Sequence, residues 1–175
     1  MENMERTAQE KDKKGFVNIG DSVLIQVKSG FYGKLVYQNR KSGDLIVWEN
    51  PGEIQLMSMR ELREMKSDQV GFFKNQWVII VGVAEGEDCK ATPEDICRAL
   101  VITQYYSNFI DPSDFEEVCN WSEAELKSRI SLMSDKAKDN LIVAIAGFIA
   151  DGKIDSIRRI KTLSKLLGCD FDTLD

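Results

Sequence analysis

Residues 134 to 171 contain two consecutive helix patterns separated by the hexapeptide DGKIDS. Ser134 is placed to cap the first helix, and Gly168 follows the second at the left-handed position that commonly ends a helix. Inside the hexapeptide, Gly152 closes the first helix and Asp155 or Ser156 opens the second. This hairpin is the most strongly specified part of the chain, and its apolar face is too wide for a solitary surface helix.

Apolar side chains cover well over half of the circumference of the first of these helices. They are Leu141, Ile142, Ala144, Ile145, Phe148 and Ile149. This width predicts either a buried central helix or a face reserved for another chain, and burial in the core is the favoured interpretation.

Other helix signals fill the rest of the second half. Thr92 and Pro93 open a helix with a cap and a first-turn proline, and Ser122 with Glu125 forms a capping box. Asp111 or Ser113 caps a further helix over DFEEV. A coiled coil would need a heptad pattern over several repeats, and here no heptad pattern continues for three repeats. Residues 92–175 are therefore predicted to form an all-α orthogonal bundle.

The first half follows strand patterns instead. Alternating or β-branched apolar runs occur in SVLIQVK, GKLVYQ, DLIVWEN, EIQLM and NQWVIIVGV, and Ser58 with Glu61 caps one helix between the last two. Short strands with one helix predict a small SH3-like antiparallel β-sheet or partly open barrel. The fold class is therefore α+β, with a flexible tail at 1–14, a β domain at 15–84, a linker at 85–91 and the bundle at 92–175.

Charge and cysteine content restrict the partners. Residues 1–84 carry net charge +1 and residues 85–175 carry −7, so the acidic half argues against nucleic acid there. Cys89, Cys97, Cys119 and Cys169 form no close pair, and the chain has no histidine, so reduced thiols are favoured over a metal site. Without a signal peptide or an apolar run long enough to span a bilayer, we expect a cytoplasmic protein with no membrane partner.

The chain shows no pattern of catalytic or cofactor-binding residues. The GFYGK stretch lacks the spacing of a phosphate-binding loop and lies between predicted strands, so a tight connection is the favoured interpretation. The adjacent acids Glu116 and Glu117, and the pair Asp151 and Asp155, are explained by helix ends and solvated faces. We therefore predict a protein that is not an enzyme, with no catalytic residue, metal, cofactor or small-molecule substrate.

Aromatic side chains are the candidates for contact with a partner, because aromatic anchors dominate protein interfaces. The candidates are Phe31, Tyr32, Tyr37, Trp48, Phe72, Phe73, Trp77, Tyr105 and Tyr106. An alternative is that Phe31, Tyr32 and Tyr37 form a base-stacking platform for nucleic acid, flanked by Lys28, Lys34, Arg40 and Lys41.

Three segments resemble a group of small tailed-bacteriophage proteins, unannotated or virion-associated. The segments are VYQNRKSGDLIVWENPGEIQLMSMRELREMKSDQVGFFKNQWVII, ALVITQYYSNFI and SDKAKDNLIVAIAGFIADGKIDSIRRIKTLSKLLG. The shared signals are the turn from Trp48 to Gly52, the helix with Leu62 and Met65, the step from Phe72 to Trp77, Tyr105 with Tyr106, and Ile154 to Ser156. The chain departs from the pattern after the serine cap, where GqK is frequent and Asp135 and Lys136 stand here.

The resemblance implies a β domain joined to a helical domain in a phage particle component or assembly factor. We therefore expect a structural protein of the head, neck or tail that contacts itself or other virion proteins, in the host cytoplasm and in the virion. The alternative is a phage regulator or anti-host factor that binds a host protein or nucleic acid through the β domain.

Overall fold

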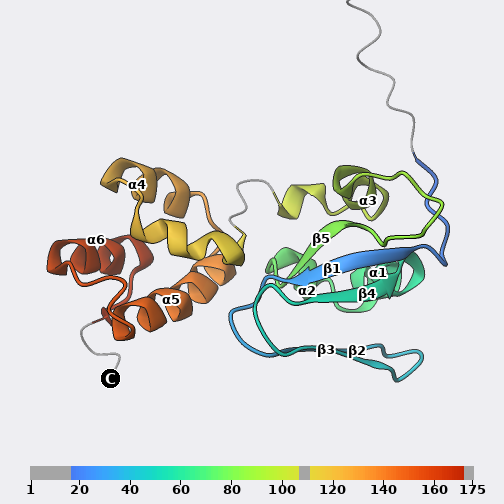
Figure 1. Cartoon of the computed structure of the whole chain (residues 1–175), viewed down its shortest axis with the longest axis horizontal. Coiled ribbons are helices and arrows are strands. Elements are labelled where there is room, and N and C mark those ends of the chain that lie inside the picture. Colours follow the sequence, from blue (N-terminus) through green and yellow to red (C-terminus); the bar gives the residue numbers. More distant parts are fainter. Residues whose placement is uncertain (1–16, 107–110, 172–175) are drawn as a thin grey trace, which may run out of the picture.

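A computed structural model describes residues 17–106 and 111–171, so the predicted tail at 1–14 lies outside the described residues. The fold is α+β, as predicted (Figure 1). The strands are β1 Leu24–Ser29, β2 Leu35–Gln38, β3 Leu45–Trp48, β4 Ile54–Ser58 and β5 Val78–Val83. The α-helices are α1 Met59–Asp68, α2 Gly71–Lys74, α3 Pro93–Ala99, α4 Glu123–Ser131, α5 Asp135–Ala150 and α6 Ile157–Leu167, and the 3-10 helices are η1 Thr103–Tyr105 and η2 Pro112–Cys119.

All strands pair antiparallel, and each matches a stretch predicted to be a strand, although β1 and β4 each run one residue further, to Ser29 and Ser58. They form a three-stranded sheet of order β4-β1-β5 and a separate two-stranded sheet of β2 and β3. The sheets approach each other along β3 and β4, where Gln55 Nε2 donates a hydrogen bond of 2.9 Å to the Val47 carbonyl oxygen. Because the ladder is interrupted there, the strands do not close into an SH3-like barrel.

The first hydrophobic core lies between these sheets and the helices α1, α2 and α3, and we call residues 17–106 the strand unit. The prediction placed α3 in the helical bundle. Instead, its buried Ile96 and the following Leu100 and Ile102 join the core of the sheet, and the Tyr106 hydroxyl donates to the Val78 carbonyl. The two cores therefore divide after Tyr106, whereas the linker was predicted at 85–91.

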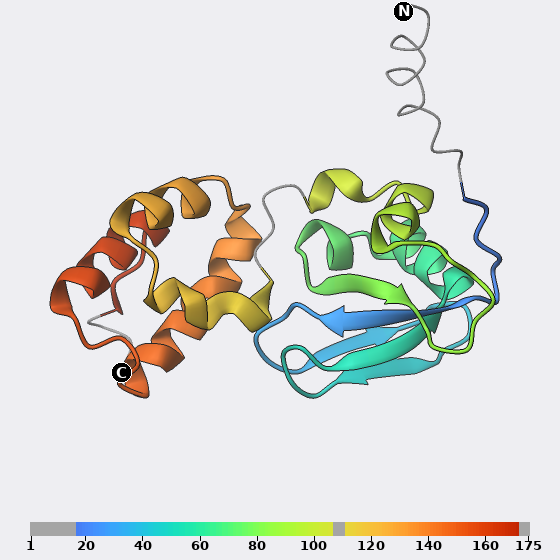
Figure 2. The same ribbon diagram turned by 45° about the horizontal axis from the view of Figure 1, so that its top comes forward.

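The second core is made by η2, α4, α5 and α6, and we call residues 111–171 the helical unit (Figure 2). The capping box of Ser122 with Glu125, the Ser134 cap and the left-handed Gly168 all occur where the sequence predicted them. Most of the wide apolar face of α5 is core: Leu141, Ala144, Ile145 and Phe148 are buried. The second half therefore uses α5 as a central helix.

Tyr37 gives a pH-dependent prediction for the strand unit. Burial, with a smaller contribution from nearby Glu64, raises its pKa from 10.0 to about 12. The unfolded tyrosine ionises at the lower pH, so this contribution to stability is complete below pH 10.0 and is lost as pH rises towards about 12. We expect Tyr37→Phe to reduce the alkaline loss of stability, measured by urea unfolding across that range. The helical unit contains no tyrosine and is the internal control; an unchanged alkaline slope in the variant would contradict the prediction.

Candidate protein-contact site

The strand unit and the helical unit are joined by the side chain of Asn140 on α5. Its Oδ1 accepts a hydrogen bond of 2.6 Å from the Tyr32 backbone N–H, and its Nδ2 donates one of 2.6 Å to the Gly30 carbonyl. A Cβ at position 30 would lie 2.4 Å from the Gln76 carbonyl oxygen, so only glycine fits this close approach. Lys28 on β1 also pairs with Asp111, at the start of the helical unit.

Aromatic rings form a row that leads from the first core to this junction. Tyr37 and Phe72 have ring centroids 5.4 Å apart, Phe72 and Trp77 5.6 Å, and Trp77 and Phe31 5.9 Å, all edge to face. Tyr32 meets Phe148 of the helical unit in the same geometry at 6.4 Å. Edge-to-face pairs add about 0.5–1.5 kcal/mol each beyond their burial. The row therefore stiffens the surface that the helical unit contacts.

A small cavity lies at the junction, and we call it the seam pocket. Its volume is about 200 Å³, and it is lined by Phe31, Tyr32, Trp77, Lys136, Asp139, Asn140 and Val143. Pockets for small molecules usually hold roughly 300–1,000 Å³. The seam pocket is below that range and has the size for one side chain of a partner.

The structure separates the predicted contact aromatics into two groups. Tyr37, Trp48, Phe72 and Phe73 are buried in the first core and are not available to a partner in this fold. The half-buried rings are Phe31, Tyr32, Trp77, Tyr105 and Tyr106, and the first three line the seam pocket. The sequence did not reveal the difference, because aromatic residues at strand ends and helix starts have the same pattern whether they face inward or outward.

Most basic residues of the nucleic-acid alternative are paired with carboxylates. Lys28 pairs with Asp111, Lys34 with Glu49 at 2.9 Å, and Lys41 with Glu64 at 3.5 Å. Arg40 is exposed beside Lys41. A nucleic-acid surface needs cations that are free to neutralise phosphates. Three of the four predicted cations already face carboxylates.

A larger apolar surface occurs on the outer side of the strands. Alternation turns Ile25, Val27, Leu35, Tyr37, Trp48 and Met57 inward. The outer positions of the same strands hold Leu24, Val36, Leu45, Val47, Ile54 and Leu56, which we call the outer strand face. Val47 is half-buried, and the other five side chains are between 36% and 61% exposed.

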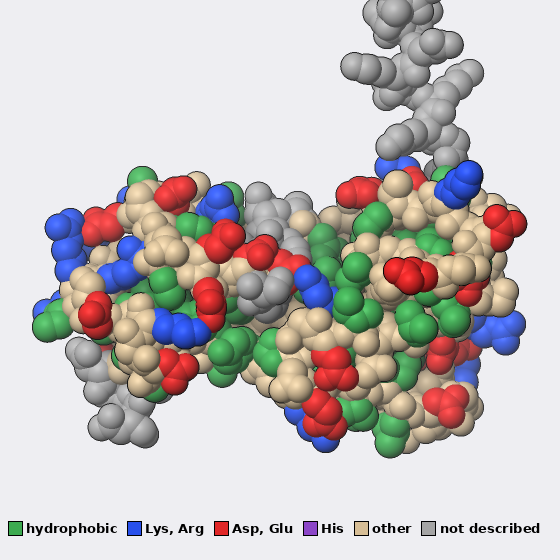
Figure 3. All heavy atoms as spheres, in the orientation of Figure 1, with side chains coloured by type: hydrophobic (Ala, Val, Ile, Leu, Met, Phe, Trp, Pro, Cys, Tyr) green, Lys and Arg blue, Asp and Glu red, His purple; other side chains and the backbone are tan. Residues whose placement is uncertain are grey.

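This arrangement differs from the usual antiparallel sheet, whose solvent side carries polar residues. On β1 and β2 the remaining outer positions are polar, namely Gln26, Lys28 and Gln38, so the apolar side chains are concentrated on β3 and β4. Figure 3 shows hydrophobic side chains at the surface of the strand unit, including the part where β2 and β3 lie in Figure 1. Single exposed apolar residues are ordinary, but several on neighbouring strands mark an interaction surface. The sequence contained this signal, because both sets of alternating positions in β2 and β3 are largely apolar.

Three of the four cysteine thiols have a pKa above the ordinary value. Burial raises the pKa of the Cys97 thiol to about 11, and burial also raises the pKa of Cys119 and Cys169. A thiol with a raised pKa is protonated at neutral pH and is a weak nucleophile. Across residues 17–106 and 111–171, no group of three or more Cys, Asp or Glu side chains is placed to hold a metal ion.

The helices of the described part are each too short or too polar to cross a membrane. Comparison of the chain with models of protein families, with curated proteins and with solved structures gives no match. The geometry of the surface is therefore the basis for assigning a function.

Proposed function

We propose that this protein acts by protein–protein contact, as a non-catalytic assembly component that associates with a second copy of itself through the outer strand face. The observation that supports this proposal is the apolar outer face itself, with five side chains more than a third exposed on β1 to β4. Burying such a surface on association is favourable by about 25 cal/mol for each Å² of apolar area removed from water.

The chemistry of the outer strand face favours a second copy as the occupant. A two-fold axis places the same patch of each copy against itself, so a charged patch would repel its own image. The outer positions of β2, β3 and β4 carry no charged residue, because Val36, Gln38, Leu45, Val47, Ile54 and Leu56 occupy them. At the rim, Lys34 and Glu49 form an ion pair and provide both signs of charge. Such a surface can match a copy of itself.

The narrower proposal is that the assembly is a tailed-phage particle, in its head, neck or tail. The resemblance of the three segments described above supports it. Mass spectrometry of purified particles tests this narrower proposal, which predicts the chain at a fixed stoichiometry. Particles that lack the chain would contradict it.

Two exposed leucines on the outer strand face provide the mutational test. We expect the double substitution Leu45→Glu and Leu56→Glu to weaken self-association by about a hundredfold or more, because unpaired charges buried in an interface cost several kcal/mol. Both leucines are more than half exposed in the single chain, so the fold should be retained. Light scattering across a dilution series measures the change.

Leu132→Glu is the matched control, because Leu132 is similarly exposed but lies at the end of α4 in the helical unit. We expect this control to associate as the unmodified chain does. A strictly monomeric unmodified chain, or equal loss of association in the control, would contradict the role of the outer strand face.

A further inference from the structure

A groove runs between α4 and α6 on the helical unit, away from the strands. It consists of two neighbouring cavities, of about 450 Å³ and about 410 Å³, that share Glu123 and Thr162 as lining residues. The first is also lined by Leu126, Ser156, Arg158 and Arg159, and the second by Ala124, Lys127, Lys165 and Leu166. We call this surface the α4–α6 groove.

The charge of this groove is opposite to that of the chain. The chain carries net charge −6, and residues 85–175 are its acidic part. Helix α6 nevertheless has four cations, Arg158, Arg159, Lys161 and Lys165, and no carboxylate between Ile157 and Leu167. All of these except Lys161 line the groove, where Lys127 of α4 adds a further cation. Glu123 is the one carboxylate among its lining residues.

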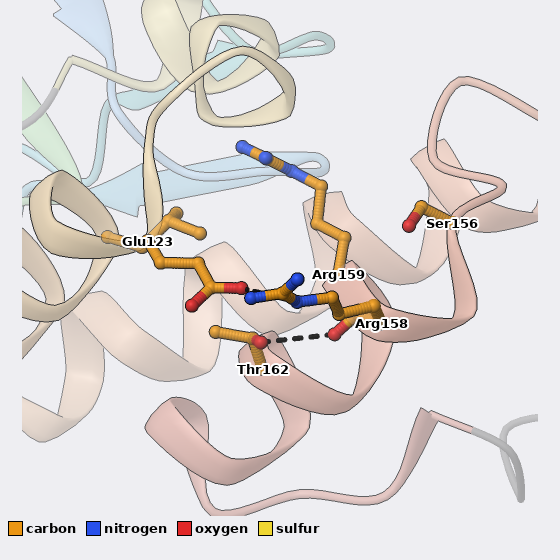
Figure 4. A pocket seen from close by; sticks show the side chains of 6 residues that line it. Glu123, Ser156, Arg158, Arg159 and Thr162 are labelled. Carbon is orange, nitrogen blue, oxygen red and sulfur yellow. Dashed lines mark hydrogen bonds and ion pairs between the residues drawn. The ribbon is translucent and has the colours of Figure 1, made fainter.

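The cations at the two ends of the groove differ in their partners. Figure 4 shows the Arg158 guanidinium against the Glu123 carboxylate, an ion pair of 2.9 Å. Arg159 donates to the carbonyl oxygens of Val118 and Trp121 at 2.5 Å and 2.6 Å, so it holds η2 and the following turn in place. Lys127 and Lys165 form no ion pair among the described residues, and both are exposed. The cationic end that can receive a partner is therefore the one with the two lysines.

The floor beneath these lysines is partly apolar. Ala124 and the half-buried Leu166 line the second cavity together with the two lysines. The buried Leu126 lines the first cavity. An apolar floor with a cationic rim complements a segment that has apolar anchors flanked by acids. A nucleic-acid strand fits less well, because Glu123 lies in the middle of the groove and no aromatic ring lines it for base stacking.

Because its rim is cationic and its lining partly apolar, we infer that the α4–α6 groove binds an acidic, partly apolar peptide segment of a partner protein. The groove belongs to the helical unit and the outer strand face to the strand unit, so this inference goes beyond the proposed self-association and does not rest on it. The chain would then contact a copy through one unit and a different protein through the other.

Selection from a library of random displayed peptides on the full chain tests this inference. We expect the selected peptides to be enriched in Asp and Glu next to Leu, Ile, Met or Phe. Their binding, measured by fluorescence anisotropy, should weaken about tenfold or more in the double variant Lys127→Glu and Lys165→Glu, since reversed rim charges repel an acidic partner. The control is Lys161→Glu, on the same helix but outside the lining of either cavity, and it should bind as the unmodified chain does.

Three results would overturn the inference. They are selected peptides without acidic enrichment, equal weakening in the Lys161→Glu control, and tighter binding of a single-stranded oligonucleotide than of any selected peptide. Circular dichroism of each variant confirms that the helices are retained. Light scattering measures self-association of the same variants and so separates this test from that of the proposed function. We expect self-association to be unchanged, because neither lysine lies on the outer strand face.

Discussion

Replacing Trp48 by alanine is expected to lower the free energy of unfolding of the strand unit by about 3–5 kcal/mol, because truncating a buried aromatic side chain loses its transfer energy and leaves a cavity. Trp48 is 0% exposed and lies at the centre of the first core. Its Nε1 also donates a hydrogen bond of 3.0 Å to the Val27 carbonyl oxygen on β1, which links the two sheets. A loss of this size is a large part of the stability of a typical domain, roughly 5–15 kcal/mol.

Guanidinium unfolding followed by circular dichroism measures this loss. Trp48→Phe is the matched control, since it keeps a ring in the core but cannot donate to Val27, and we expect it to lose less than Trp48→Ala. Of the two tryptophans that remain, Trp77 packs against the first core and Trp121 lies in the second, so tryptophan fluorescence follows both units. If Trp48→Ala left the stability of the strand unit unchanged, the placement of this side chain between the two sheets would be wrong.

The second large effect is expected at Asn140. Asn140→Leu keeps a side chain of similar size but leaves the Tyr32 N–H and the Gly30 carbonyl without their hydrogen bonds. Each buried polar group left unpaired costs about 1–3 kcal/mol. Both of these backbone groups lie where the two units meet. We expect the units to separate there, because the unpaired N–H and carbonyl can then form hydrogen bonds with water. We expect the two units of the variant to tumble independently.

NMR relaxation of backbone amides measures this change as a shorter rotational correlation time for each unit. Asp139→Leu is the control, because Asp139 neighbours Asn140 in the lining of the seam pocket but is exposed and makes no hydrogen bond to the strand unit. The control should tumble as the unmodified chain does. A single unchanged correlation time for Asn140→Leu would show that this amide does not hold the units together.

Local signals predicted the elements well. Each strand lies in its predicted stretch or extends one residue beyond it, and the capping boxes at Ser58 and Ser122 begin α1 and α4 as expected. Gly152 and Gly168 both have positive φ, at 72° and 68°, where the sequence predicted helix ends. These features depend on a few adjacent residues, so a single sequence contains enough information to place them.

Long-range packing was predicted less well. The pattern of α3 indicates a helix with a cap and one apolar side, and this pattern does not specify whether Ile96 packs on helices or on β5. In the same way, an asparagine inside a helix has no local signal that its amide will bind the backbone of a distant loop, as Asn140 does with Gly30 and Tyr32. Contacts between residues more than a hundred positions apart are set by the assembled fold.

The net charge of each half of the chain also did not predict where a charged partner could bind. The acidic total of residues 85–175 conceals α6, whose cations line a groove, while the cations chosen in the first half mostly face carboxylates. Charge affects binding through its local arrangement on a surface, because screening limits its range to about 8–10 Å in physiological salt.

The central claim is that the outer strand face is the surface by which copies of the chain associate. Hydrogen exchange of the full chain, measured by mass spectrometry at low and high protein concentration, tests it directly. We predict that peptides covering β2, β3 and β4 exchange more slowly as concentration rises, while peptides covering α4 and α6 do not change. Concentration-independent exchange in β2 to β4, or slowing confined to the helical unit, would contradict the claim.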